Sequence, residues 1–380
     1  MNKRRLFLSC FLLAFLILLI SLSTALVLFT LASIQSQIET TFGEPGPSLP
    51  ETQKLWFQLL LYINKEKLIT PLNPHAQAQS FLITPNEPTP LILARLAQEG
   101  LISDPQLLQA LMQYLGYDTQ IQTGEHVLSA GMSPYQIAKA LIDPANLLIQ
   151  FELLAGWRTE EISTALVASG LNFTAQEFLE AATQPLGIYL PHRSSSSITS
   201  LEGFLMPASY RLLKNASPED LLRLFTQNFD AQVSMKIDQQ FQQQGLEFYE
   251  GIILASIVQR ESVVEEEMPL IASVFLNRLR ARMKFDSDAT VQYALGFNAV
   301  QNTWWTNPLS TADFAIDSPY NTYLYPGLPP TPICNPSLSA ILAVANAPQS
   351  DYLYFRAACD GSGRHIFAKT YPEHLENTCP

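Results

Sequence analysis

The 380-residue chain is 47% hydrophobic and only 15% charged, a composition that supports sizeable buried cores and excludes an intrinsically disordered protein. Its formal net charge of -12 is a poor electrostatic match for nucleic acid, so we expect no nucleic-acid partner. A neutral or mixed-charge polymer is compatible with this charge.

The N-terminal segment predicts where the chain lies. Lys3, Arg4 and Arg5 precede an apolar run over residues 6–34 that contains no charged residue. The run is longer than the roughly 20 residues that cross the hydrocarbon core of a bilayer. We predict a single-pass transmembrane anchor over 6–34 in the cell membrane, with residues 1–5 in the cytoplasm and the body outside. A cleaved signal peptide is the alternative, but its apolar part usually spans only about 7–15 residues.

Residues 35–53 are polar and interrupted by glycine and proline, which predicts a linker between the anchor and the body. Three segments then repeat one plan: an apolar extended run, a turn, and a Ser or Thr that opens a short helix. The candidate helix caps are Thr89, Ser133 and Thr159, each followed by proline or glutamate.

A strand, a turn and a helix of this size resemble LysM-like glycan-binding units. We therefore assign residues 54–170 to a LysM-like α+β domain. Periodicity alone favours an ordinary α+β packing unit without a ligand, so that alternative stays open.

Four cysteines are present, and Cys10 lies in the predicted membrane segment. Cys334, Cys359 and Cys379 would all face the oxidising side, where one intramolecular disulfide is possible. The pairing cannot be derived from the sequence. No cysteine or histidine spacing resembles a metal site, and we expect neither a metal nor a cofactor.

Residues 171–380 are predicted to form a mixed helix and strand domain, in which the segment GIILASIVQRESVVEEE carries the chemistry. Leu254, Val258 and Glu261 share one helix face, so Glu261 should project from an apolar stripe. Burial raises the pKa of a carboxyl group, and a carboxylic acid that keeps its proton at neutral pH suits general-acid cleavage of a glycosidic bond.

A buried glutamate paired with Arg278 or Arg280 is the alternative for Glu261. The neighbouring acidic run at 265–267 is interpreted as a solvated helix end.

Several polar residues downstream are candidates for substrate binding. Asn277 can face a groove, and Asp288 either caps the helix that starts near Thr290 or binds sugar hydroxyls. His365 follows the turn of a predicted hairpin, although a lone histidine is more often structural. A loop rich in proline and glycine concentrates ring, amide and hydroxyl groups that suit a sugar face: Tyr320, Asn321, Thr322 and Tyr323.

Five segments in this order resemble successive motifs of the YceG-like (MltG) family of endolytic murein transglycosylases: LASIVQRES, ASVFLNRLRARM, DSDATVQYALG, PYNTYLYPGLPPTPICNP and YLYFRAACDGSGRHIF. The resemblance places the family's catalytic glutamate at Glu261. The family usually has an acidic residue at the position of Gln259, so the pH dependence is expected to differ if that carboxylate tunes the acid. TWWT at 303–306 resembles an insertion that can alter a subsite.

The resemblance implies cleavage of the MurNAc–GlcNAc bond in nascent peptidoglycan strands, with a 1,6-anhydro end as product and termination of strand elongation. Glycan strands, the membrane and cell-wall synthases are the expected partners. Two alternatives stay open: a lysozyme-type hydrolase in which Asp288 or another carboxylate activates water, and a non-catalytic wall-binding scaffold.

Overall fold

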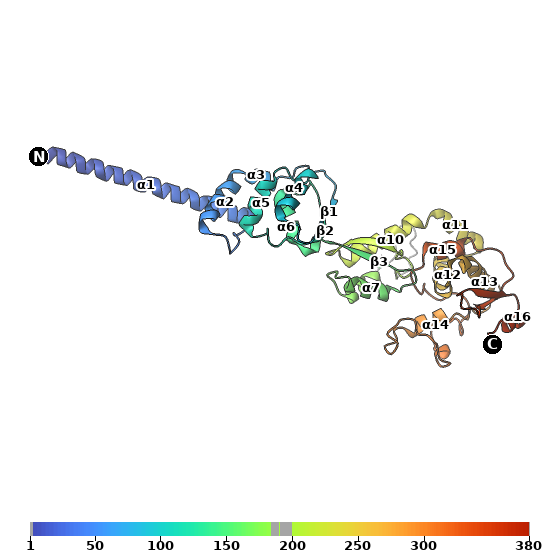
Figure 1. The fold of residues 1–380 in the computed structure, drawn as a ribbon. Helices are drawn as coiled ribbons and strands as arrows, with labels where there is room; N and C mark the ends of the chain where they lie inside the picture. Colours follow the sequence, from blue (N-terminus) through green and yellow to red (C-terminus); the bar gives the residue numbers. More distant parts are fainter. Residues whose placement is uncertain (1–2, 184–189, 191–199, 380) are drawn as a thin grey trace. The chain divides into compact units, whose positions relative to one another are not determined.

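The computed structural model describes residues 3–183, 190 and 200–379 and divides the chain into two compact units, Met1–Ile149 and Gln150–Pro380 (Figure 1). Both units combine helices with short strands, which confirms the predicted α+β class. Residues 1 and 2 of the predicted cytoplasmic segment lie outside the described residues, as does the side chain of Cys10.

The elements of the first unit are α1 (Lys3–Phe42), α2 (Glu51–Ile63), α3 (Lys65–Ile69), β1 (Gln79–Ile83), α4 (Thr89–Gln98), α5 (Pro105–Leu115), β2 (Gly124–Leu128) and α6 (Pro134–Ile142). A strand at the boundary, β3 (Leu148–Leu153), leads into the second unit. Its elements are α7 (Thr159–Ala168), α8 (Ala175–Ala182), β4 (Ala208–Leu213), α10 (Pro218–Gln232), α11 (Met235–Gln244), α12 (Phe248–Glu261), α13 (Met268–Arg280), α14 (Asp288–Leu295), α15 (Leu338–Ala345), β5 (Tyr354–Ala357), β6 (His365–Ala368) and α16 (Tyr371–Glu376).

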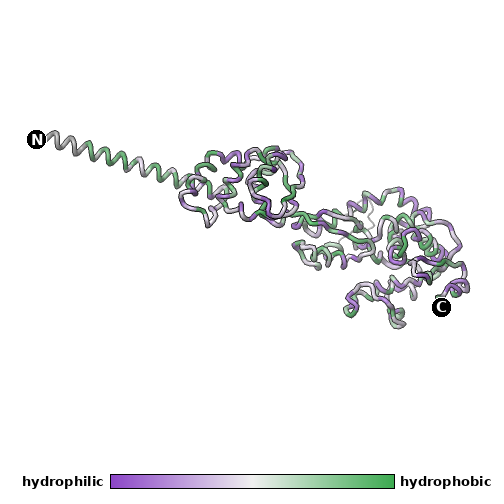
Figure 2. Tube along the Cα trace, viewed as in Figure 1, coloured by the Kyte–Doolittle hydropathy of each residue, from purple (hydrophilic) through white to green (hydrophobic). Residues whose placement is uncertain are grey.

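Helix α1 is 40 residues long, and its part from Phe15 onward is long and apolar enough to cross a membrane. Figure 2 shows its free part as hydrophobic along most of its length. The helix continues to Phe42 and α2 begins at Glu51, so the predicted linker at 35–53 is wrong over residues 35–42 and 51–53. Ile34, Ile38 and Phe42 recur every four residues and pack into the core of the first unit, which stabilises the helix beyond the apolar run.

The first unit contains a strand–helix–helix–strand arrangement. Strands β1 and β2 pair antiparallel, from Gln79 opposite Leu128 to Ile83 opposite Gly124. Helices α4 and α5 connect them and pack on each other. Phe81, Ile83 and Leu128 alternate along the strands on the buried face, as a sheet with one covered face requires.

The boundary between the units falls after residue 149, whereas the sequence predicted it after residue 170. Strand β3 of the third repeat pairs with β4, and α7 packs on α8, so these segments have their partners in the second unit. Only one predicted cap is confirmed: Ser133 accepts a hydrogen bond from Gln136 N. Thr89 and Thr159 are already the first helical residues of α4 and α7, one position past the cap.

The second unit is built around α12, whose residues from Gly251 to Val258 are all buried. Helices α11, α13, α14 and α15 pack around it. A cluster of buried aromatic rings, Phe204, Phe229 and Phe241 among them, supports its N-terminal half. This packing fixes the position of the last turn of α12, where the acidic residue lies.

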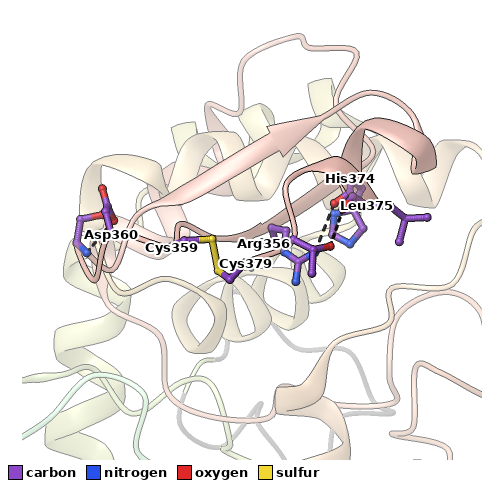
Figure 3. The surroundings of a disulfide bond; sticks show 8 residues. Arg356, Cys359, Asp360, His374, Leu375 and Cys379 are labelled. Atoms are coloured by element: carbon purple, nitrogen blue, oxygen red, sulfur yellow. Dashed lines mark hydrogen bonds between the residues drawn. A yellow bond between two sulfur atoms is a disulfide. The ribbon is translucent and has the colours of Figure 1, made fainter.

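The C-terminal hairpin consists of β5 and β6, which pair antiparallel. Cys359 forms a disulfide with Cys379, which resolves the pairing that the sequence left open (Figure 3). Arg356 adds hydrogen bonds to Thr378 Oγ1 and His374 O. The chain end and α16 are thereby tied to the hairpin. Cys334 is a free cysteine and is buried.

Candidate active site

Glu261 is the last residue of α12 and lies beside the start of α14. Leu254 and Val258, on the same face of α12, are fully buried, so the predicted apolar stripe is confirmed. Ser287 Oγ donates a hydrogen bond to Glu261 Oε1, and the backbone N–H of Ala289 donates another to the carboxyl group. The partly buried carboxyl group is therefore held between the C-terminal end of one helix and the N-terminal end of another.

Opposing effects set the proton affinity of Glu261. Burial raises the pKa of its carboxyl group, and the negative charge of Asp288 raises it further, whereas the hydrogen bonds from Ser287 and Ala289 and the nearby His365 lower it. The net effect is a raised pKa. The C-terminal end of α12 disfavours a negative charge and the N-terminal end of α14 favours one. Such a site can hold the carboxyl group in either protonation state.

The arginine pairing that the sequence left open for Glu261 is absent among the described residues. Arg278 instead forms a salt bridge with Asp286 at 3.3 Å and donates to the carbonyl oxygens of Phe285 and Leu353 at 2.6 Å each. Arg280 donates to Gln244. Both guanidinium groups thus bind other segments of the chain, and neither forms a salt bridge with the Glu261 carboxyl group.

Asp288 and Tyr323 form a polar pair close to Glu261. Tyr323 Oη donates a 2.7 Å hydrogen bond to Asp288 Oδ1. Asp288 is the first residue of α14, and Ser287 occupies the cap position, so the Asp288 carboxylate is not the helix cap. It is exposed and influences the charge state of Glu261.

Two other residues of the tyrosine-rich loop are buried and hydrogen-bonded within the protein. Asn321 is fully buried, and its Nδ2 donates to the carbonyl oxygens of Phe314 and Ile316. Thr322 is also buried, and its Oγ1 accepts a hydrogen bond from Ser287 N at 3.1 Å. These two side chains are used within the protein.

Tyr320 likewise has partners within the chain. Its Oη hydrogen-bonds Thr331 Oγ1 at 2.7 Å, and its ring packs on that of Tyr293. The ring remains partly exposed. Of the four loop residues predicted to bind substrate, Tyr323 is the one whose hydroxyl group bonds Asp288, the acidic residue close to Glu261.

Asn277 holds the loop before β5. Its Nδ2 donates to the carbonyl oxygens of Ser350 and Tyr352 at 2.8 and 2.9 Å. Both amide hydrogens are thus used by the backbone of that loop.

His365 and Glu267 form a second, largely buried pair. His365 Nδ1 lies 3.0 Å from Glu267 Oε2, and the backbone N–H of His365 donates to the same carboxylate. Glu267 is only 7% exposed, so the interpretation of residues 265–267 as a solvated helix end is wrong at this position. Glu267 orients the imidazole ring, whose charge is felt at Glu261.

The model of the YceG-like family matches residues 81–379. The chain belongs to the YceG-like family. The endolytic murein transglycosylase of Bacillus subtilis (strain 168) is 27% identical over 296 residues, which cover 74% of this chain and 79% of that protein.

A protein of the same description from Streptococcus pneumoniae (strain R6) is 29% identical over 304 residues, and the match covers 74% of this chain but 54% of its own length. The crystal structure of a yceG-like protein from Listeria monocytogenes superimposes with a TM-score of 0.53 at 27% identity, over 79% of this chain and 99% of that chain.

In this YceG-like chain, the Gln259 side chain lies away from the Glu261 carboxyl group. Its Oε1 accepts a 2.9 Å hydrogen bond from Ser337 N, at the start of α15. Residues two apart on a helix project about 200° from each other, so the two side chains face different neighbours. Gln259 therefore joins α12 to the start of α15.

The TWWT segment of the YceG-like chain is anchored by stacking on two arginines. Trp305 lies 3.7 Å from the guanidinium carbon of Arg260, and its Nε1 donates to Glu161 at 3.0 Å. Trp304 covers Arg158 at 4.6 Å. These contacts fix the segment against α7 and α12.

Sequence reasoning missed Ser287 and Glu267. Ser287 stands between two aspartates, which drew attention to Asp288 as the cap, and its own capping position was the available signal. Glu267 lies in a run of three glutamates that resembles a solvated helix end. Its partner is 98 residues away, so no local pattern reveals the pair.

Proposed function

We propose that this chain is a membrane-anchored endolytic peptidoglycan lytic transglycosylase and that Glu261 is its acid and base. The observation that carries the proposal is a single carboxyl group with a raised pKa, held by Ser287 and Ala289 at the junction of α12 and α14. Curated relatives named endolytic murein transglycosylases support the reaction class.

In the proposed first step, protonated Glu261 gives its proton to the glycosidic oxygen between MurNAc and GlcNAc, and the bond to the anomeric carbon breaks. The Glu261 carboxylate then takes the proton of the muramyl 6-hydroxyl, whose oxygen bonds to the anomeric carbon. The product is a 1,6-anhydroMurNAc end, and no water is consumed. One carboxyl group acts as acid and then as base. The hydrogen bonds from Ser287 and Ala289 stabilise it in its charged state.

Asp288 and Tyr323 are proposed to contact substrate hydroxyl groups and to orient the 6-hydroxyl group for attack. His365, held by Glu267, is proposed to line the same site and to stabilise the Glu261 carboxylate. For Asn277, Tyr320, Asn321 and Thr322 we propose a supporting role, since their polar groups already have partners within the chain.

A hydrolase is the second candidate because Asp288 is an exposed carboxylate close to Glu261. Digestion of purified glycan strands in water enriched in oxygen-18 distinguishes the two by mass spectrometry. The transglycosylase gives 1,6-anhydro ends without label, whereas a hydrolase gives labelled reducing ends. If well-folded protein cleaves the strands by neither route, the result would favour a wall-binding scaffold.

The first unit is proposed to hold the chain at the membrane and to bind glycan. Helix α1 would cross the cell membrane with its basic N-terminus inside, which leaves the body outside. The strand–helix–helix–strand arrangement of β1, α4, α5 and β2 supports a LysM-like role in presenting glycan strands to the catalytic unit. Cell-wall synthases, which make the nascent strands, are the proposed protein partners.

A further inference from the structure

Helix α2 has two apolar faces, and only one of them is covered. Phe57 and Leu61 are buried in the core of the first unit. On the other side, five large apolar side chains are between 39% and 77% exposed: Leu55, Trp56, Leu59, Tyr62 and Ile63. At 100° per residue these five fall within an arc of about 120°, so they form one continuous stripe. We call it the α2 stripe.

The α2 stripe needs a partner because a contiguous apolar patch on the surface marks an interaction site more often than chance exposure does. The rings of Trp56 and Phe57 contact each other at 5.2 Å between centroids, which holds the exposed indole in place. Within the first unit, α2 packs against α1 and lies at the end from which the free part of α1 emerges (Figure 1).

The end of the apolar run in α1 identifies the partner. Ile34, the last residue of that run, packs against the same buried cluster as Phe57 and Leu61. From Leu12 to Phe29 the large side chains of α1 are exposed, and the most apolar stretch of the helix contains no buried residue. A bilayer that covers this surface would end near Ile34, where α1 enters the core that also contains Phe57 and Leu61 of α2.

We propose that the α2 stripe lies in the membrane–water interface of the bilayer that α1 spans. The inference rests on the proposed anchor. Tryptophan and tyrosine prefer the headgroup level, and a helix with one apolar face buries it there parallel to the membrane plane. Trp56 and Tyr62 supply the interfacial groups, and Leu55, Leu59 and Ile63 supply the apolar contact. The first unit is thus seated on the lipid surface.

The full chain, reconstituted in phosphatidylcholine vesicles, tests the proposal through the fluorescence of Trp56. One set of vesicles carries bromine on the acyl chain near the headgroup, a second near the chain end. The emission of Trp56 is obtained by subtracting the emission spectrum of Trp56→Phe from that of the wild type. We expect loss of this emission in bromolipid, greater with the shallow bromine. Trp304, stacked on Arg158, gives the matched control: the difference between wild type and Trp304→Phe should stay unquenched.

The outcomes separate the anchor from the stripe. Protein that fails to float with the vesicles overturns the anchor and this inference together. Protein that floats, but whose Trp56 emission neither bromolipid quenches, overturns the inference and leaves the anchor standing. If soluble glycan fragments, and not lipid, shield Trp56 from a quencher, the α2 stripe binds glycan, and this result also overturns the inference. Ile63→Glu, at a 77% exposed position, should reduce the quenching in correctly folded protein.

Discussion

Glu261 stands where two helix ends with opposite partial charges meet, and this position would let one carboxyl group act first as acid and then as base in the proposed reaction. Burial and the end of α12 favour the neutral acid, while Ser287 and the N–H of Ala289 favour the carboxylate. The balance raises the pKa of the Glu261 carboxyl group, while the two hydrogen bonds stabilise its charge after the proton has left. A glutamate paired with an arginine would lose the first property, because the positive charge would hold it ionised.

Ser287→Ala should slow the reaction and move its pH dependence upward. The lost hydrogen bond stabilised the charged form, so the pKa of Glu261 rises and the acid stays protonated to higher pH. We expect kcat to fall by up to about a hundredfold and the alkaline limb of kcat/KM to move to higher pH. Ser287→Thr, which keeps the hydroxyl group, should restore part of the rate. An unmoved alkaline limb would contradict the assigned role of Ser287.

Among the elements, three segments are joined at one buried point in the second unit. Glu202 accepts hydrogen bonds from Thr159 N and Asn335 Nδ2, and Asn335 Oδ1 accepts from Gly203 N and Leu205 N. This connects the start of α7, the segment before β4 and the loop before α15. Burial raises the pKa of Glu202 from 4.5 to about 8, so the folded protein holds it neutral at neutral pH.

Glu202→Gln should flatten the dependence of stability on pH. In the wild type the unfolded chain ionises near pH 4.5 while the folded chain stays protonated to about pH 8. The free energy of unfolding from this group is therefore highest at low pH and falls by a few kcal/mol between about pH 5 and about pH 8. Urea denaturation across this range measures it. An equally steep fall in the glutamine variant would show that other groups cause the dependence.

The disulfide closes a loop of about twenty residues that contains β6 and α16. Replacing Cys359 and Cys379 together by serine should cost about 3 kcal/mol of stability. Because the hairpin presents His365, we also expect weaker catalysis. Thermal unfolding with and without a reducing agent checks this: reduced wild type and the double serine variant should coincide. A variant as stable as oxidised wild type would contradict the expectation.

Short-range patterns in the sequence predicted the elements best. The stripe of Leu254, Val258 and Glu261 located α12, and Ser133 with Pro134 located the start of α6. Pairing between distant segments could not be predicted from the sequence. Because β3 pairs with β4, about 60 residues further along the chain, the predicted boundary between the units was too late. Asn321 and Thr322 looked like binding groups because side-chain type shows hydrogen-bonding capacity, whereas the partners that use it come from distant segments.

On the scale of the whole molecule, the chain combines an apolar helix, a unit continuous with that helix and a unit that contains Glu261. Helix α1 runs without a break into the core of the first unit, so a helix and not a flexible linker joins the first unit to the proposed anchor. This connection would limit how far the first unit can move from the lipid surface.

The full chain should stay with the membrane after extraction at alkaline pH, and a variant without residues 6–32 should be released. The apolar run is long enough to span, and the basic residues before it should remain inside. Protease added outside cells with a permeable wall should therefore digest the body. A body that is protected from outside protease and digested only after lysis would reverse the proposed orientation.

The most direct test of the central claim is mass spectrometry of glycan strands treated with Glu261→Gln, beside Glu266→Gln as a matched control. Both changes remove one carboxylate, but Glu266 is exposed and five residues further along. We predict that 1,6-anhydro ends disappear with Glu261→Gln and persist at the wild-type level with Glu266→Gln. Anhydro ends that persist with folded Glu261→Gln would contradict the assignment of the acid and base to Glu261.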